Sequence, residues 1–371
     1  MTSTRSRLTC EQRAAATSAE RRIYINAAPG SGKTTVAAER FGVLRWEPDD
    51  DLRRILALSF TRSACAELCT RIRQRWGRTA LSWPHVGMTI DALHCEILTY
   101  LLRTEAVSWP GGLTELTVLD NWRGQKAARW MAESMGYRRA ITLDGTAVGT
   151  RGIPVNRAGH YVGKKEDFES HLRAGRCAHE DVRHLVLASL KNAELKAIIA
   201  EFLRATTKAV IVDEVFDANE LDLALVWLAA EEGLSVTVIG DPWQALYDFR
   251  GARPDLVPGM VEAGAFTTYP VSRSFRFTTD TMRTVAEKAR SGAPVSLATS
   301  ADIAECDVVL ARKWKDLWDV ADCVLPLSFG RLANQTDYYG LRWPRVLVSL
   351  GPSSGVGTGA VSRLIWPRLV G

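Results

Sequence analysis

The sequence predicts an α/β protein built on a parallel sheet, and two observations carry that prediction. Four short apolar runs of β-branched residues recur along the chain, at 23–27, 54–60, 208–212 and 234–239. Each run ends in a glycine-rich, acidic or polar-aromatic turn, and helix-forming sequence follows the first two. Strands that alternate with helices are typical of parallel sheets, whose ligands bind at the carboxyl edge.

The composition is that of a globular protein of two or three domains. The chain has 371 residues, of which 46% are hydrophobic and 24% charged, and its formal net charge is +5. This mild positive charge is compatible with a nucleic-acid partner but does not establish one. No apolar run reaches the roughly eighteen residues of a membrane span, and residues 1–8 lack a signal-peptide core, so we expect no membrane and a cytoplasmic location. The seven cysteines favour reduced thiols.

The first apolar run leads into a phosphate-binding loop. Residues 28–35 read Ala-Pro-Gly-Ser-Gly-Lys-Thr-Thr, and the helix-forming run 36–41 follows. Glycines let backbone N–H groups surround an anion, and the helix directs its positive end at the same place. Lys33 would reach the β- and γ-phosphates, and Thr34 would offer its hydroxyl to Mg²⁺. The general motif begins with Gly where this chain has Ala27. An ordinary strand-to-helix turn is the alternative, and it leaves the motif unexplained.

Two carboxylates follow the third apolar run. Asp213 would hold Mg²⁺, and Glu214 would orient and deprotonate an attacking water. The alternative is the start of a loop. Given the phosphate loop, we favour the catalytic interpretation.

Gln12 has two open interpretations. Thr9 and Gln12 have the spacing of a helix capping box. Alternatively, the amide of Gln12 could read the edge of a purine, since it offers both a donor and an acceptor.

The turn after the fourth apolar run combines an amide, two aromatic rings and an arginine. These are Gln244, Tyr247, Phe249 and Arg250. Aromatic faces stack unpaired bases, and arginine pairs with phosphate. A hydrophobic corner with one surface arginine is the alternative, and the turn alone does not decide.

Taken together and in this order, the segments resemble the UvrD/Rep group of superfamily one DNA helicases over residues 8 to about 277. The matching segments are 8–12 (Q motif), 27–34 (motif I, where a first alanine is ordinary), 58–68 (Ia), 89–93 (Ib), 212–219 (II), 240–252 (III, in a RecB-like form) and 274–276 (IV). The resemblance implies ATP and Mg²⁺ as cofactors and single-stranded DNA as the partner.

The resemblance also assigns roles to individual residues. The implied nucleotide-binding residues are Gln12, Ala27, Ala28, Pro29, Gly30, Ser31, Gly32, Lys33, Thr34, Thr35 and Phe275, with Mg²⁺ on Thr34 and Asp213. The implied catalytic residues are Lys33, Asp213, Glu214, Gln244 (a γ-phosphate sensor) and Arg276 (an arginine finger). The implied DNA-binding residues are Phe60, Thr61, Arg62, Thr89, Tyr247, Phe249 and Arg250. Three positions are compared with the family pattern. Phe216 stands where the family has Gln, and Thr35 stands where it often has Arg. Asp91 is a mild change, because the family usually has His or Asp there.

The resemblance implies a RecA-like phosphate-loop NTPase fold with interruptions. We expect a first RecA-like domain at 1–107 and 207–270, and an inserted, mostly helical subdomain at 108–206. Within the insertion, 122–135 and 184–204 look helical and 143–163 is uncommitted. We expect a partial second RecA-like domain at 271–330, with a strand at 304–312, and an irregular tail at 331–371. Two further family motifs are not found, so we expect a truncated second domain. The composition of the tail suggests out-of-frame or degenerate sequence.

The function that we expect is a UvrD-like ATP-dependent DNA helicase that moves 3′ to 5′ on single strands. ATP binding should be retained, hydrolysis should be slow, and truncation should impair unwinding. One alternative is a DNA-stimulated ATPase or accessory switch without unwinding. Another is a non-enzymatic remnant that binds single-stranded DNA, and a small-molecule kinase is a weaker third.

Overall fold

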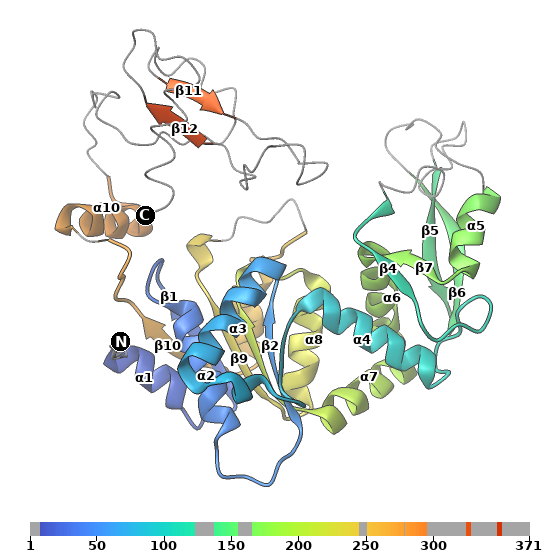
Figure 1. Ribbon diagram of the computed structural model, residues 1–371, viewed down its shortest axis with the longest axis horizontal. Helices are drawn as coiled ribbons and strands as arrows, with labels where there is room; N and C mark the ends of the chain where they lie inside the picture. Colours follow the sequence, from blue (N-terminus) through green and yellow to red (C-terminus); the bar gives the residue numbers. More distant parts are fainter. Residues whose placement is uncertain are drawn as a thin grey trace. The chain divides into compact units, whose positions relative to one another are not determined.

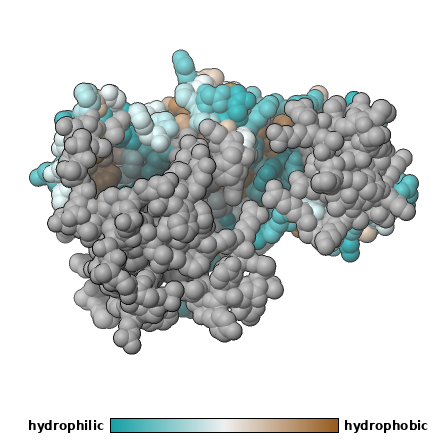
Figure 2. Space-filling model, turned by 90° about the horizontal axis from the view of Figure 1, so that it is seen from above, coloured by the Kyte–Doolittle hydropathy of each residue, from teal (hydrophilic) through white to brown (hydrophobic). Residues whose placement is uncertain are grey.

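The computed structural model describes residues 8–122, 137–154, 165–244, 251–277, 279–294, 324–327 and 347–350. The chain divides into two compact units, Met1–Arg290 and Ser291–Gly371. Within the described ranges, no helix is both long enough and apolar enough to cross a membrane. Seen from above, most of the described surface is hydrophilic, with hydrophobic areas in a few places (Figure 2).

A six-stranded parallel sheet forms the centre of the first unit (Figure 1), which confirms the predicted α/β class. In spatial order the strands are β10 (Thr267–Val271), β1 (Arg22–Ala27), β9 (Ser235–Gly240), β8 (Thr207–Asp213), β2 (Arg54–Ser59) and β3 (Val86–Thr89). The four predicted apolar runs are β1, β2, β8 and β9. Their carboxyl ends therefore lie along one edge, where the predicted motifs follow them.

Alternating side chains of these strands build a separate core on each face of the sheet. Ile23 and Ile25 join one cluster, which includes residues of α1 (Cys10–Thr17), α2 (Lys33–Arg45) and α3 (Arg62–Trp76). Tyr24, between them, belongs to the opposite cluster with α4 (Ile90–Arg103), α8 (Glu220–Glu231) and α9 (Leu256–Ala263). Burial on both faces explains why the strands read as nearly continuous apolar runs.

Strand β10 was not predicted from the sequence. Its five residues, Thr-Thr-Tyr-Pro-Val, are mostly exposed and include Pro270, which lacks a backbone donor. An edge strand tolerates proline, and β10 lies at the edge beside β1, with Ala27 opposite Val271. The chain that leaves β10 therefore starts next to the phosphate loop.

The inserted region contains helices and two small sheets. The predicted helical segment 184–204 is two helices, α6 (His179–Lys191) and α7 (Ala193–Thr206), because the Asn192 side chain accepts hydrogen bonds from two backbone N–H groups and caps α7. The uncommitted stretch contains part of a hairpin of β5 (Tyr137–Asp144) and β6 (Ala147–Pro154). Apart from Trp122, the predicted helical segment 122–135 lies outside the described residues.

The described part of this region has three further elements. They are β4 (Thr117–Leu119), which pairs with β7 (Arg176–Ala178), and α5 (Lys165–Arg173).

The second unit contains one described strand pair, β11 (Val324–Leu327) with β12 (Leu347–Leu350), which run antiparallel. Strand β12 falls within 331–371, so part of the stretch predicted to be irregular is a strand. The predicted strand at 304–312 lies outside the described residues. The last helix of the first unit is α10 (Asp280–Ser291).

Candidate nucleotide site

The phosphate loop joins β1 to α2 through two glycines in the left-handed region. Gly30 has φ +72° and Gly32 has φ +85°. Residues that carry a Cβ adopt such backbone angles only with strain. The N–H of Ser31 donates to the carbonyl of Ala28 (3.0 Å), which closes the turn. Gly32 is the N-cap of α2, and Lys33 is its first residue. The first N–H groups of a helix lack partners within the helix, so this helix start suits an anion.

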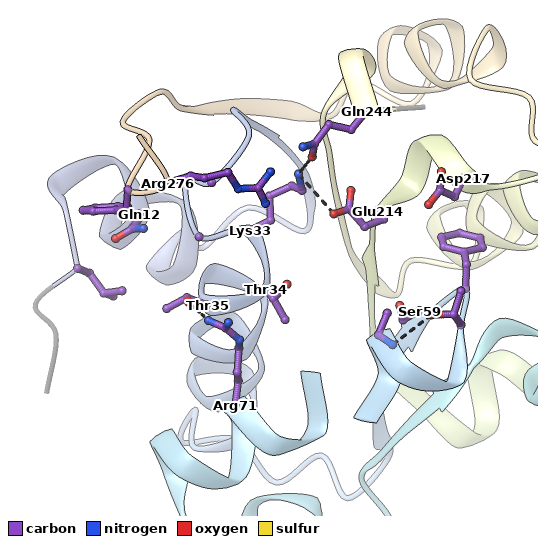
Figure 3. A pocket seen from close by; sticks show the side chains of 17 residues that line it. Gln12, Lys33, Thr34, Thr35, Ser59, Arg71, Glu214, Asp217, Gln244 and Arg276 are labelled. Carbon is purple, nitrogen blue, oxygen red and sulfur yellow. Dashed lines mark hydrogen bonds and ion pairs between the residues drawn. The ribbon is translucent and has the colours of Figure 1, made fainter. Parts of the chain in front are cut away.

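Lys33 is the point where three segments of the site meet. Its ammonium donates to the Oε1 oxygen of Gln244, which lies in the short helix η4 (Pro242–Gln244) after β9. The same nitrogen lies 3.4 Å from Oε1 of Glu214, after β8 (Figure 3). Only 7% of Lys33 is exposed. The structure therefore brings together three of the predicted catalytic residues.

The predicted acidic pair occupies two different environments. Asp213 is 4% exposed, and burial raises its pKa to about 6, helped by the Glu214 carboxylate and opposed by the Thr34 hydroxyl and Lys33. Within the described part of the chain, Asp213 Oδ1 has no hydrogen-bond partner. Glu214 is more exposed and has φ +63°, an uncommon backbone state for a residue with a side chain. This conformation turns the chain into η3 (Val215–Asp217) and directs Glu214 toward Lys33.

A cavity of about 880 Å³ opens in front of these residues. It is lined by Leu8, Gln12, Gly30, Gly32, Lys33, Thr34, Thr35, Ser59, Phe60, Thr61, Ala64, Arg71, Glu214, Asp217, Gln244, Phe275 and Arg276. Most predicted nucleotide-binding residues are in this set, together with Phe60 and Thr61, which were predicted to bind DNA.

Other predicted residues lie away from the cavity lining. Arg62 forms an exposed ion pair with Asp120 (2.7 Å), and the Thr89 hydroxyl caps α4 by accepting from the N–H of Ala92 (3.3 Å). Thr61, which does line the cavity, similarly caps α3. Tyr247, Phe249 and Arg250 lie outside the described residues.

Gln12 forms the capping box and also contacts the loop. Its Oε1 accepts from the N–H of Thr9 (2.9 Å), and its Nε2 donates to the carbonyl of Ser31 (2.8 Å). The amide has a second N–H, and its oxygen has a second lone pair. Contact with a purine therefore stays a prediction alongside the observed capping role.

Residues 272–276, which we call the strap, follow β10 and lie against the phosphate loop. The Ser274 hydroxyl donates to the carbonyl of Pro29 (2.7 Å), and the N–H of Phe275 donates to the carbonyl of Gly30 (2.8 Å). Phe275 is 52% exposed, and Arg276 points toward Lys33 in Figure 3. The cavity therefore has cationic side chains from both the loop and the strap.

Asp241 organises the turn that carries Gln244. This aspartate is 1% exposed, and its backbone carbonyl accepts from the N–H of Gln244 (2.9 Å). Its Oδ1 accepts from the N–H of Trp243 (3.1 Å), and its Oδ2 pairs with Arg290 of α10 (2.8 Å). These contacts hold η4 in the position where Gln244 meets Lys33.

Phe216, which stands where motif II of the family has Gln, is a core residue. Its ring is 5% exposed and packs edge-to-face on Tyr24, with 6.4 Å between ring centroids. It also lies against Gly240, where an added Cβ would come within 2.7 Å of the ring. The position therefore fills the core and offers no amide to the cavity.

Arg71 is a lining residue that sequence reasoning missed. It lies on α3, donates through Nη1 to the Thr35 hydroxyl (2.8 Å), and pairs with Glu67 (2.6 Å). Thr35 stands where the family often has arginine, and the structure places a guanidinium beside it from another helix. No local pattern marks Arg71, because its approach depends on how α3 packs on α2.

The parallel sheet, the glycine loop and the acidic pair at the strand ends define a RecA-like phosphate-loop fold. A family model described as UvrD/REP helicase N-terminal domain matches residues 8–132 and 156–261. The chain therefore belongs to the UvrD/REP helicase family.

Curated relatives match the same part of the chain. The probable DNA helicase II homolog of Mycoplasma capricolum is 26% identical over 269 residues, covering 67% of this chain and 36% of that protein. The ATP-dependent DNA helicase Rep of Salmonella typhimurium is 24% identical, covering 62% and 35%, and DNA helicase II of the same organism is 26% identical, covering 66% and 34%. The chain thus spans about a third of the length of these relatives.

One solved structure, of two coordinating Pif1 helicases at forked DNA, aligns with 78% of this chain and 49% of that chain, at a TM-score of 0.35 and 13% identity.

Proposed function

We propose that this chain is an ATP-dependent DNA helicase whose first unit binds and hydrolyses ATP and which moves on single-stranded DNA. The observation that carries the proposal is the position of Lys33, between the Glu214 carboxylate and the Gln244 amide in a cavity that Arg276 also lines. Three cationic side chains, Lys33, Arg71 and Arg276, line this one cavity and favour a polyanionic ligand such as a triphosphate. The names of the relatives support ATP as the nucleotide and DNA as the substrate.

The residues present are suited to Mg²⁺. Thr34 and Asp213 would hold the ion with a hydroxyl and a carboxylate, the hard oxygen donors that Mg²⁺ prefers. The buried Asp213 Oδ1, which lacks a hydrogen-bond partner in the described part of the chain, supports this assignment. When bound, the ion neutralises charge on the phosphate oxygens.

The chain's own groups then divide the work of hydrolysis. Lys33 would bind the terminal phosphates, and Glu214 would orient a water and accept its proton. Gln244 would contact the γ-phosphate and so link it to the turn after β9. Arg276 would stabilise the charge that develops on the γ-phosphate, a contact worth about 10³-fold or more in rate in related chemistry.

Single-stranded DNA is proposed to bind at the carboxyl edge of the sheet. Phe60 and Thr61 directly follow β2 and line the cavity, and the aromatic ring there could stack on a base. Arg62 lies shortly after the end of β2, and Thr89 is the last residue of β3. Both therefore lie at the same carboxyl edge of the sheet. A cytoplasmic location would suit this function.

The test is ATP hydrolysis by the full chain with and without single-stranded DNA, alongside Lys33→Ala. Lys208→Ala is a matched control, because Lys208 lies near the opposite end of β8 and pairs with Asp49 (3.0 Å). We expect hydrolysis that DNA stimulates, that Lys33→Ala abolishes and that Lys208→Ala leaves nearly unchanged.

Further outcomes separate the alternatives. DNA-stimulated hydrolysis without strand displacement would favour an ATPase switch over a helicase. DNA binding with no hydrolysis would favour a non-enzymatic remnant and would contradict the proposal.

A further inference from the structure

Helix α1 contacts both the phosphate loop and the strap, through two consecutive residues. Gln12 donates to the carbonyl of Ser31 in the loop (2.8 Å). Glu11, the residue before it, contacts Ser272 at the start of the strap. One short helix is therefore attached to two segments that are about 240 residues apart in sequence.

Glu11 contacts Ser272 through both of its carboxylate oxygens. The N–H of Ser272 donates to Oε2 (2.8 Å), and the Ser272 hydroxyl donates to Oε1 (2.8 Å). These bonds, the backbone one from Ser272 foremost, hold the pKa of Glu11 below its usual value. Hydrogen bonds to an ionised acceptor are stronger and more directional than neutral ones.

The rest of the strap has few other attachments. Ser272, Arg273, Phe275 and Arg276 are exposed, and the strap meets the loop through the bonds of Ser274 to Pro29 and of Phe275 to Gly30. Little apolar burial holds such a segment, so its position depends on individual hydrogen bonds. Ser272, which Glu11 contacts, lies three residues before Phe275. Its position therefore limits where the backbone can place Phe275 and Arg276.

We propose that Glu11 is a positioning residue, which holds Ser272 and thereby keeps the strap on the phosphate loop with Phe275 and Arg276 facing the nucleotide cavity. This inference rests on the proposed function for its effect on ATP, but the contact itself is independent of hydrolysis. Without Glu11 the strap would leave the loop more often. Nucleotide would then meet an incomplete site, and part of its binding energy would be used to order the strap.

The first measurement is hydrogen exchange on the nucleotide-free full chain. The amides of Ser272 and Phe275 are both hydrogen-bonded, so Glu11→Ala should speed exchange in a peptide covering 271–277 by roughly tenfold, while peptides from β8 stay unchanged. Glu20→Ala is the matched control, because Glu20 is exposed and lies a few residues beyond α1. Unchanged exchange in the strap of Glu11→Ala would overturn the proposal.

The second measurement is rescue by a reversed pair. Glu11→Lys should release the strap, and adding Ser272→Glu should restore an attachment through an ion pair between Lys at position 11 and Glu at position 272. We expect Glu11→Lys to weaken the binding of a non-hydrolysable ATP analogue by about fivefold, and the double variant to recover most of that loss. A double variant that binds no better than Glu11→Lys would count against a positioning role.

Steady-state kinetics connect the contact to the reaction. We expect Glu11→Ala to raise KM for ATP by about fivefold, with a smaller fall in kcat, because Arg276 still reaches the cavity whenever the strap is in place. If the wild-type chain hydrolyses no ATP, the proposed function fails, whereas the exchange and analogue-binding results still decide the role of Glu11.

Discussion

The ammonium nitrogen of Lys33 lies 3.4 Å from the Oε1 oxygen of Glu214, so the proposed phosphate-binding cation and the proposed general base are direct neighbours. The left-handed conformation of Glu214 (φ +63°) produces this approach. Backbone strain of this kind is often kept where it positions a functional group.

Glu214→Gln should separate nucleotide binding from hydrolysis. The substitution keeps the shape of the side chain and removes its charge and basicity. We expect the rate of ATP hydrolysis to fall by about a hundredfold or more, with ATP affinity unchanged or slightly higher. Hydrolysis and equilibrium binding should be measured together, with Glu231→Gln, a surface residue paired to Lys196, as the control. Hydrolysis within about twofold of wild type would remove Glu214 from the catalytic set.

Gly30→Ala should displace the strap as well as strain the loop. A Cβ at position 30 would overlap Cβ of Arg276 and come within 2.9 Å of the Ser274 hydroxyl, and the φ of +72° adds strain of about 1–2 kcal/mol. Gly145→Ala is a matched control, because Gly145 has φ +59° and nothing lies within 4 Å of an added Cβ. Both variants should lose comparable thermal stability from strain, but only Gly30→Ala should lose nucleotide binding. Equal binding in the two variants would contradict this account.

Arg71→Ala should weaken nucleotide binding more than turnover. The guanidinium lines the cavity and holds the Thr35 hydroxyl at 2.8 Å, on the side of the loop away from Glu214 in Figure 3. We expect KM for ATP to rise several-fold, which corresponds to a loss of about 1 kcal/mol of binding free energy, with kcat little changed. Arg73→Ala, on the same helix but outside the cavity lining, should leave both constants close to wild type. A fall in kcat alone would place Arg71 in the chemistry instead.

His94 should make folding stability depend on pH. Its side chain is 1% exposed and lies 3.1 Å from Asp222 and 3.6 Å from Asp91, which also pairs with Arg183. Burial disfavours the imidazolium, but the two carboxylates outweigh it and raise the pKa of His94. A raised pKa contributes stability that is complete below the unfolded value of about 6.5 and is lost as pH rises through the folded value.

Urea unfolding checks this dependence. The free energy of unfolding should decrease as the pH rises above about 6.5 and through the raised pKa of His94, and His94→Gln should flatten that slope. At the lower pH the variant should lose about 3 kcal/mol, because it leaves the buried Asp222 carboxylate without its cation. An equal slope in wild type and variant would show that His94 stays neutral.

Much of the fold and the centre of the site could be predicted from local sequence. The runs that became β1, β2, β8 and β9 are buried on both faces, so their apolar character is continuous and easy to recognise. Each is followed directly by the residues that it positions, which is why Lys33, Asp213 and Glu214 were identifiable. Strand β10 gave no such signal, because it is an exposed edge strand that contains proline.

The sequence by itself determined the chemistry of the phosphate loop: two glycines that can take positive φ, a lysine and a threonine at the start of a helix, and the acids at the end of another strand. These features depend on backbone freedom and on residues adjacent in the chain. Only the tertiary structure decided that Arg71 reaches Thr35, that Phe216 fills the core against Tyr24, and that Glu11 holds the strap. Those contacts join elements far apart in sequence, and their partners are set by how helices and strands pack on the two faces of the sheet.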